Sequence, residues 1–82
     1  MPERDFILYI EDIYEAAKKI SSYTNHMSFE SFSSDEMRID AVVRNFLIIG
    51  EAAGKIPESV QESYPSVKWH KLNGLRNILV HE

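Results

Sequence analysis

Residues 33–57 read SSDEMRIDAVVRNFLIIGEAAGKIP, and this stretch decides the fold of the 82-residue chain. Ser33 and Glu36 have the spacing of a capping box at a helix start, while Gly54 and Pro57 are typical of a helix end. Between them, apolar residues recur every three or four positions, so they return to one face of an α-helix. The stripe is the heptad seam that packs helices nearly antiparallel in a bundle, and it comprises Ile39, Val42, Phe46, Ile49 and Ala53.

A first helix is predicted upstream, from Asp5 to about Ser21. Its apolar face is expected to comprise Phe6, Ile10, Ile13, Tyr14, Ala17 and Ile20. The serine-rich stretch 22–34 has no sustained period and is predicted to be a connection. Three of its apolar residues are expected to reach the core: Met27, Phe29 and Phe32.

Downstream, one or two helical turns are predicted between Pro57, at the first helical position, and Tyr64. A last helix is expected to begin near residues 67–71, with Leu72, Leu75 and Leu79 facing the core. No segment alternates with the period of a strand over more than four residues. The predicted fold class is therefore all-α, an antiparallel helical bundle that forms a single domain over residues 1–82.

Gly50 and Gly54 lie four residues apart and thus on one face of the central helix. An interior glycine costs a helix about 1 kcal/mol, which is tolerated mainly where a neighbouring backbone or ligand comes close. We expect a close helix crossing there. The alternative is that Gly54 only belongs to a frayed helix end.

The composition limits the classes of function. There is no cysteine, no apolar run of the ~18 residues that span a membrane, and no signal peptide at the start, so a cytoplasmic protein is expected. The net charge of −4 argues against coating nucleic acid through bulk electrostatics. A domain this small buries only about 60% of its unfolded surface, so oligomerisation is expected to support it.

Chemistry is expected in the last predicted helix, because metal-ligand pairs, phosphate loops and nucleophile elbows are missing from the sequence. We therefore expect no metal and no cofactor. Polar residues concentrate in and around this helix: His70, Asn73, Arg76, Asn77 and His81. Arg76 and His81 flank Asn73 and Asn77 within one arc, so these four can face one cleft.

Arg76 can clamp a phosphate with two hydrogen bonds, and His81 can move a proton near neutral pH. Together they suit metal-free RNA cleavage, in which a base takes the ribose 2′-hydroxyl proton and the hydroxyl attacks phosphorus. Asn77, with Asn73 on the same line, can orient the imidazole or donate to phosphate. The bland alternative is a chance pair of surface side chains.

The polar residues outside this motif can be interpreted in two ways, as functional or as structural. Arg44 shares a face with Glu51, beside Asn45, and could line a common groove or could belong to a solvated face with surface ion pairs. We interpret His70, beside Trp69, mainly as a structural residue, and His26 as solvated.

Two separated segments carry a family resemblance. Residues 74–82, GLRNILVHE, resemble the signature of HEPN domains, and residues 44–53, RNFLIIGEAA, resemble the second helix of the HepT-like branch. Residues 5–23 are similar to its first helix, so the likeness covers nearly the whole chain.

The resemblance implies a homodimer in which Arg76 and His81 of both subunits meet in a cleft and cleave RNA without a metal, as the toxin of a toxin–antitoxin pair. The implied partner is a minimal nucleotidyltransferase antitoxin of the MntA type, which adds AMP to a tyrosine two residues beyond the histidine. This sequence ends one residue after His81, so the tyrosine and the family's last helix are missing from it. We therefore expect a C-terminally truncated domain.

Two other classes of function remain open. A non-catalytic helical adaptor could bind a nucleotidyltransferase or a nucleotide in the same polar cleft, which the acidic balance favours slightly. A purely structural bundle would place Arg76 and His81 away from any cleft or interface.

Overall fold

The computed structural model describes residues 5–81, which form five helices and no strand. The helices are α1 (Phe6–Thr24), α2 (Phe29–Ser33), α3 (Glu36–Gly54), α4 (Glu58–Ser63) and α5 (Trp69–His81). The predicted all-α class is confirmed. Within the described residues, no helix is long and apolar enough to cross a membrane.

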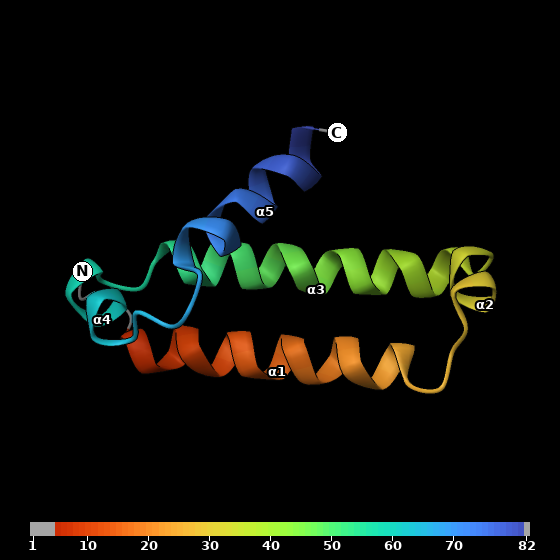
Figure 1. Cartoon of the computed structure of the whole chain (residues 1–82), viewed down its shortest axis with the longest axis horizontal. Helices are drawn as coiled ribbons and strands as arrows, with labels where there is room; N and C mark the ends of the chain where they lie inside the picture. Colours follow the sequence, from red (N-terminus) through yellow and green to blue (C-terminus); the bar gives the residue numbers. More distant parts are fainter. Residues whose placement is uncertain (1–4, 82) are drawn as a thin grey trace.

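Helices α1 and α3 form the body of the fold, lying side by side in opposite directions (Figure 1). Each has 19 residues, about 28 Å at 1.5 Å per residue. The buried positions of α3 include a row spaced by three, four and three residues, as helix packing in a bundle requires: Val42, Asn45, Ile49 and Ala52. The predicted antiparallel arrangement is therefore confirmed.

The predicted apolar face of α1 is wrong at some positions. Tyr14 is 62% exposed and Ala17 is also exposed, whereas Ala16 is buried. The inward positions, each buried or half-buried, follow a seam shifted by part of a turn: Phe6, Tyr9, Ile13, Ala16, Ile20 and Tyr23. α1 is apolar around much of its surface, so periodicity alone supports both faces.

The stretch 22–34 is more ordered than predicted. It contains the last turn of α1 and the short helix α2, whose N-terminus is capped by the Ser28 side chain accepting from the Ser31 N–H at 3.0 Å. Phe29, expected in the core, is 82% exposed, while Met27 and Phe32 are half-buried. Helix α2 has only five residues, so it can turn one side chain toward the core. That side chain is Phe32, and Phe29 is left in solvent.

The predicted capping box at the start of α3 is also wrong. Ser33 ends α2, and its hydroxyl donates to the Glu30 carbonyl at 3.2 Å. The cap is Asp35, whose carboxylate accepts from the Arg38 N–H at 3.1 Å. Ser33 and Asp35 both favour caps, and the turn that ends α2 selects the aspartate.

Pro57, predicted at the first helical position, is instead the N-cap of α4, which begins one residue later at Glu58. The Gln61 side-chain amide of α4 donates back to the Ala53 and Ile56 carbonyls, at 3.3 and 3.0 Å. The Ala53 carbonyl also accepts from the Ile56 N–H at 3.3 Å, so the Gln61 bonds add to the capping of the last turn of α3. They also fix the reversal that sends the chain toward α5.

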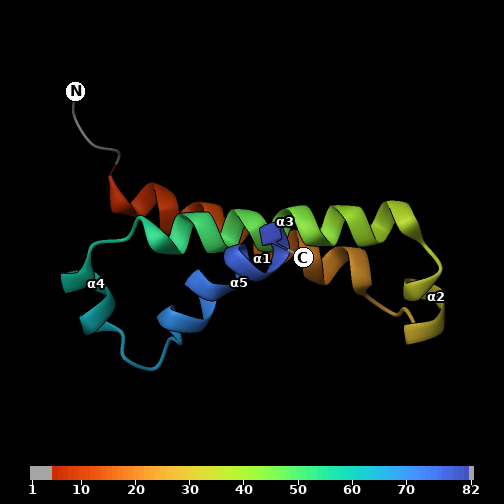
Figure 2. The same ribbon diagram turned by 90° about the horizontal axis from the view of Figure 1, so that it is seen from above.

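Helix α5 crosses α3 steeply near the C-terminal end of α3 (Figures 1 and 2). Gly50 is buried, and a Cβ placed on Gly54 would lie 3.4 Å from Asn73 Oδ1 of α5. The predicted close crossing at the glycines is therefore confirmed. Leu72, Leu75 and Leu79 are half-buried on the inner side of α5, as predicted.

Candidate functional site at the crossing of α3 and α5

Helix α5 carries the predicted catalytic positions. Arg76 and His81 both belong to it, five residues and hence about 7.5 Å apart along the axis. Their side chains lie outside the described part of the structure. Their convergence on one cleft therefore stays a prediction.

Asn73 and Asn77 are one turn apart on α5, and both are exposed. Asn73 faces α3 at Gly54, where a Cβ would lie 3.4 Å from the Asn73 amide oxygen, at the short limit of ordinary van der Waals contact. The structure thus brings Asn73 to the crossing with α3, while the cleft that it was predicted to share with Arg76 and His81 stays a prediction.

A groove of about 440 Å³ lies at this crossing. We call it the α3–α5 groove, and it is lined by Gly50, Glu51, Gly54, Lys55 and Asn73. The two glycines have no side chains to fill the groove. The polar groups that border it are the Glu51 carboxylate, the Lys55 ammonium group and the Asn73 amide. Its volume falls within the roughly 300–1,000 Å³ of ligand pockets.

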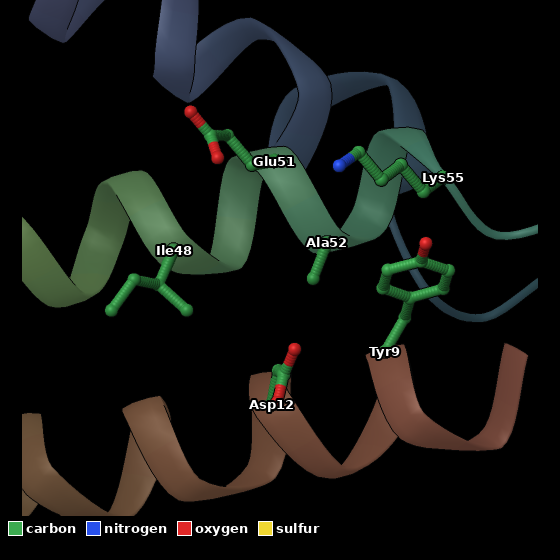
Figure 3. A pocket seen from close by; sticks show the side chains of 6 residues that line it. All are labelled: Tyr9, Asp12, Ile48, Glu51, Ala52 and Lys55. Carbon is green, nitrogen blue, oxygen red and sulfur yellow. The ribbon is translucent and has the colours of Figure 1, made fainter. Parts of the chain in front are cut away.

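A second groove of about 340 Å³ lies between the first and third helices. Figure 3 shows this α1–α3 groove, lined by Tyr9, Asp12, Ile48, Glu51, Ala52 and Lys55. The Lys55 ammonium lies 5.7 Å from the centre of the Tyr9 ring, within cation–π range. Glu51 and Lys55 line both grooves, so the polar surface continues across α3 from Tyr9 to Asn73.

The other predicted residues of α3 have different environments. Arg44 is exposed, two turns before Glu51, so the polar face predicted for these two residues exists. Asn45, predicted beside them on that face, is instead only 5% exposed, and its amide donates to the Ala41 carbonyl at 2.8 Å. A bond to its own helix satisfies the amide inside the core, which a polar residue type does not reveal in advance.

His26 is exposed, as predicted, and His70, interpreted mainly as a structural residue, is exposed as well. His70 follows Trp69, whose indole N–H donates to the Tyr64 carbonyl at 3.1 Å and fixes the entry to α5. Among the described residues, no three His, Asp or Glu side chains are grouped as a metal site would require.

Sequence reasoning missed Lys55 and Tyr9 as members of the polar surface. Lys55 follows Glu51 by four residues, a spacing that places both on one face and could have indicated the pair. Tyr9 carried no signal, because its position depends on which face of α1 turns inward.

At the N-terminal end of α3, polar side chains make hydrogen bonds that hold the fold together. Arg38 Nε donates to Asp35 at 3.1 Å, and its guanidinium also donates to the Tyr23 carbonyl of α1 at 2.8 Å. The Arg38 backbone N–H, and then its guanidinium, hold the pKa of Asp35 below the ordinary 3.8. These groups join the ends of two helices.

Comparisons with known proteins identify the family of this chain. The family model described as "Ribonuclease HepT-like" matches residues 13–82. Two proteins of Methanocaldococcus jannaschii that carry RNase names are 38% and 37% identical over 82 residues, all of this chain and 68% and 75% of their own lengths. A protein of Thermococcus cleftensis named "Probable ribonuclease HepT" is 37% identical over 73 residues, 89% of this chain and 66% of its own length.

No solved structure matches the chain significantly. The chain spans about two thirds of the length of several of these relatives. The family match covers α3 and α5 in full, and with them both grooves except Tyr9 and Asp12. The chain therefore belongs to the HepT-like ribonucleases, the HEPN branch that its sequence resembles.

Proposed function

We propose that the chain is a metal-independent endoribonuclease and acts as the toxin of a toxin–antitoxin pair. Its membership in a ribonuclease family carries the proposal, since the matched residues 13–82 include both Arg76 and His81. The substrate is RNA. The proposed partner is a minimal nucleotidyltransferase of the MntA type, and the proposed compartment is the cytoplasm.

In the proposed reaction, His81 takes the proton of a ribose 2′-hydroxyl, and the hydroxyl oxygen attacks the adjacent phosphorus. The bond to the 5′-oxygen breaks, and that oxygen takes a proton, leaving a 2′,3′-cyclic phosphate. Arg76 stabilises the charge that gathers on the phosphate oxygens, because its guanidinium donates two parallel hydrogen bonds. Asn77 and Asn73 supply neutral donors beside them, and Arg44 holds a more distant phosphate.

We further propose that the active form is a homodimer, with Arg76 and His81 of both subunits around one cleft. The resemblance of residues 74–82 to the HEPN signature carries this part of the proposal, and the small core of the described residues supports it. Its largest buried residues are aliphatic side chains such as Ile49 and Ile56, without a buried aromatic ring among the described residues.

The test is cleavage of structured RNA by the purified protein in the presence of a chelator. Replacing His81 by alanine should lower the cleavage rate by about 10²–10⁴-fold, the usual contribution of a general acid or base. His70→Ala is the matched control, because it removes an exposed histidine from the same helix. Helix content, measured by circular dichroism, should be equal in all three proteins.

Full cleavage by the His81→Ala protein would overturn the catalytic role. Intact RNA with the wild-type protein, together with tight binding of the nucleotidyltransferase, would instead support the non-catalytic adaptor. The adaptor is favoured by the acidic balance of the chain, −4 overall.

A further inference from the structure

Positive charge is concentrated near the end of the sequence. Residues 1–63 hold 12 acidic and 6 basic residues, a net charge of −6. Residues 64–81 hold 3 basic residues and no acidic residue, a net charge of +3. This segment contains α5 and the turn that leads into it. An anionic partner is therefore attracted to this helix rather than to the rest of the chain.

Two of the three positive charges lie together at the start of α5. Lys68 directly precedes the helix, and its carbonyl accepts from the Lys71 N–H at 3.0 Å. The turn before them is fixed as well, because the Tyr64 carbonyl accepts from the Val67 N–H and from the Trp69 indole N–H, each at 3.1 Å. These bonds hold Lys68 and Lys71 in one turn, and we call them the lysine pair.

The charge of the lysine pair is not neutralised by the described residues. Lys68 and Lys71 are both exposed, and neither makes an ion pair within the part of the chain that the structure describes. Other cations are engaged: Arg38 pairs with an aspartate, and Lys18 and Lys55 each lie over a tyrosine ring. Like charges within one helical turn repel each other. Anions bound beside the pair would remove this repulsion.

We propose that the lysine pair is a docking site for the phosphate backbone of RNA, an inference that rests on the proposed function. Lys68 and Lys71 each hold a phosphate outside the linkage that is cleaved, because an ammonium group binds phosphate as a point charge. Lys71 precedes Arg76 by five residues, about 7.5 Å along the axis of α5, so the pair lies beyond the phosphate assigned to Arg76. The rest of the chain is acidic, so the attraction of RNA depends on such a local site.

The surroundings of the pair favour RNA over an acidic protein. A protein interface has an apolar centre with a polar rim, whereas the exposed side chains among the described residues of α5 are polar apart from Ile78. Tyr64, which is 57% exposed in the turn before the pair, adds a ring on which a base can stack. Cations beside an aromatic ring are typical of sites that bind single-stranded RNA.

RNA binding can be measured without cleavage, by fluorescence anisotropy with a labelled single-stranded RNA whose 2′-hydroxyls are methylated. Such an RNA has no hydroxyl to attack the phosphorus. The double variant Lys68→Gln, Lys71→Gln loses two phosphate contacts, so the slope of log affinity against log salt should become shallower by about 1.4. The same loss corresponds to an RNA affinity about 25-fold lower at about 0.1 M salt.

The double variant Lys18→Gln, Lys19→Gln is the matched control, because it removes the same two charges from exposed positions of α1. It should leave the salt slope unchanged, and Lys68→Arg, Lys71→Arg should keep the RNA affinity because both charges remain. Equal losses in the two glutamine proteins would mean that RNA responds only to net charge. That result, or an unchanged slope without Lys68 and Lys71, would overturn the proposal.

Cleavage of unmodified RNA separates this inference from the proposed function. Cleavage by the wild type, together with RNA binding that does not depend on the lysine pair, would overturn the docking site and keep the nuclease. Binding that depends on the pair, without cleavage, would overturn the nuclease and keep the docking site. Loss of nucleotidyltransferase binding in the Lys68→Gln, Lys71→Gln protein, with RNA binding unchanged, would overturn the proposal in favour of an acidic protein surface.

Discussion

The two ends of α3 use polar residues in opposite ways. At the N-terminal end, Asp35 and Arg38 bond to each other, and Arg38 also bonds to α1 at Tyr23. At the C-terminal end, Glu51 and Lys55 line two surface grooves, and Lys55 contacts α1 only through the face of the Tyr9 ring. The difference teaches that a charged residue beside another helix does not by itself indicate function; the shape of the surface around it does.

Both ends depend on the packed seam between them, and breaking that seam should have the largest effect. Ile49 is 7% exposed in the middle of this seam, so Ile49→Ala removes buried methylene groups and leaves a cavity. We expect a loss of about 2–5 kcal/mol in the free energy of unfolding. Urea unfolding followed by circular dichroism measures it.

The matched control is Ile7→Ala in α1, where the side chain is 53% exposed. It should cost well under half as much, because a half-exposed side chain gains little from burial. Equal losses of unfolding free energy in Ile49→Ala and Ile7→Ala would show that the buried row of α3 is not the main source of stability.

The sequence was sufficient to predict the antiparallel helices, because apolar spacing fixes where a long helix forms. It also predicted the crossing at Gly54, although the same glycine is the last residue of α3, so the helix-end reading holds as well. It did not predict the inward face of α1. The apolar spacing of α1 allows either Tyr9 and Ala16 or Tyr14 and Ala17 to face inward. Only packing against α3 determines that Tyr9 and Ala16 do so.

The candidate site was predicted along α5 but not across α3. Asn73, predicted only to face a cleft with Arg76 and His81, lies against Gly54 of α3. Asn45 was misplaced, because an amide that bonds to its own helix can be buried without a partner from another helix. Lys55 was overlooked, because its meaning depends on Tyr9, which is 46 positions earlier in the chain.

A smaller change in stability is expected at Gly74 of α5, where the structure leaves space for a side chain. A Cβ placed on Gly74 meets no atom within 4 Å, so Gly74→Ala should gain the helix propensity of alanine without a clash. We expect a gain of about 1 kcal/mol, and a melting temperature higher by roughly 4–8 °C for a domain of this size. Differential scanning calorimetry measures both.

Gly54→Ala sharpens the comparison between the two glycines. Its Cβ would lie 3.4 Å from Asn73 Oδ1, so the gain should be smaller than at Gly74. A larger gain at Gly54 would contradict the close approach of α5 to α3.

The smallest effect is expected at the paired end of α3 and depends on pH. The pKa of Asp35 is held below 3.8 in the folded protein, chiefly by the Arg38 backbone N–H and then by the guanidinium. The folded state therefore binds this proton less readily than the unfolded state. Asp35 stabilises the fold above pH 3.8, and the contribution is lost as the pH falls through the folded pKa.

Asp35→Asn tests this sign, because asparagine keeps the N-cap hydrogen bond and removes the charge. Wild type should be the more stable protein at pH 7, and the difference should shrink as the pH falls below 3.8. The effect is small because the Asp35 and Arg38 side chains are both about two-fifths exposed, so solvent screens their attraction.

Asp40→Asn, at an exposed position of the same helix, is the control for general charge removal. A difference between wild type and Asp35→Asn that does not change with pH would mean that the charge pair contributes nothing, and that the hydrogen bond from Arg38 to Tyr23 alone joins this end of α3 to α1.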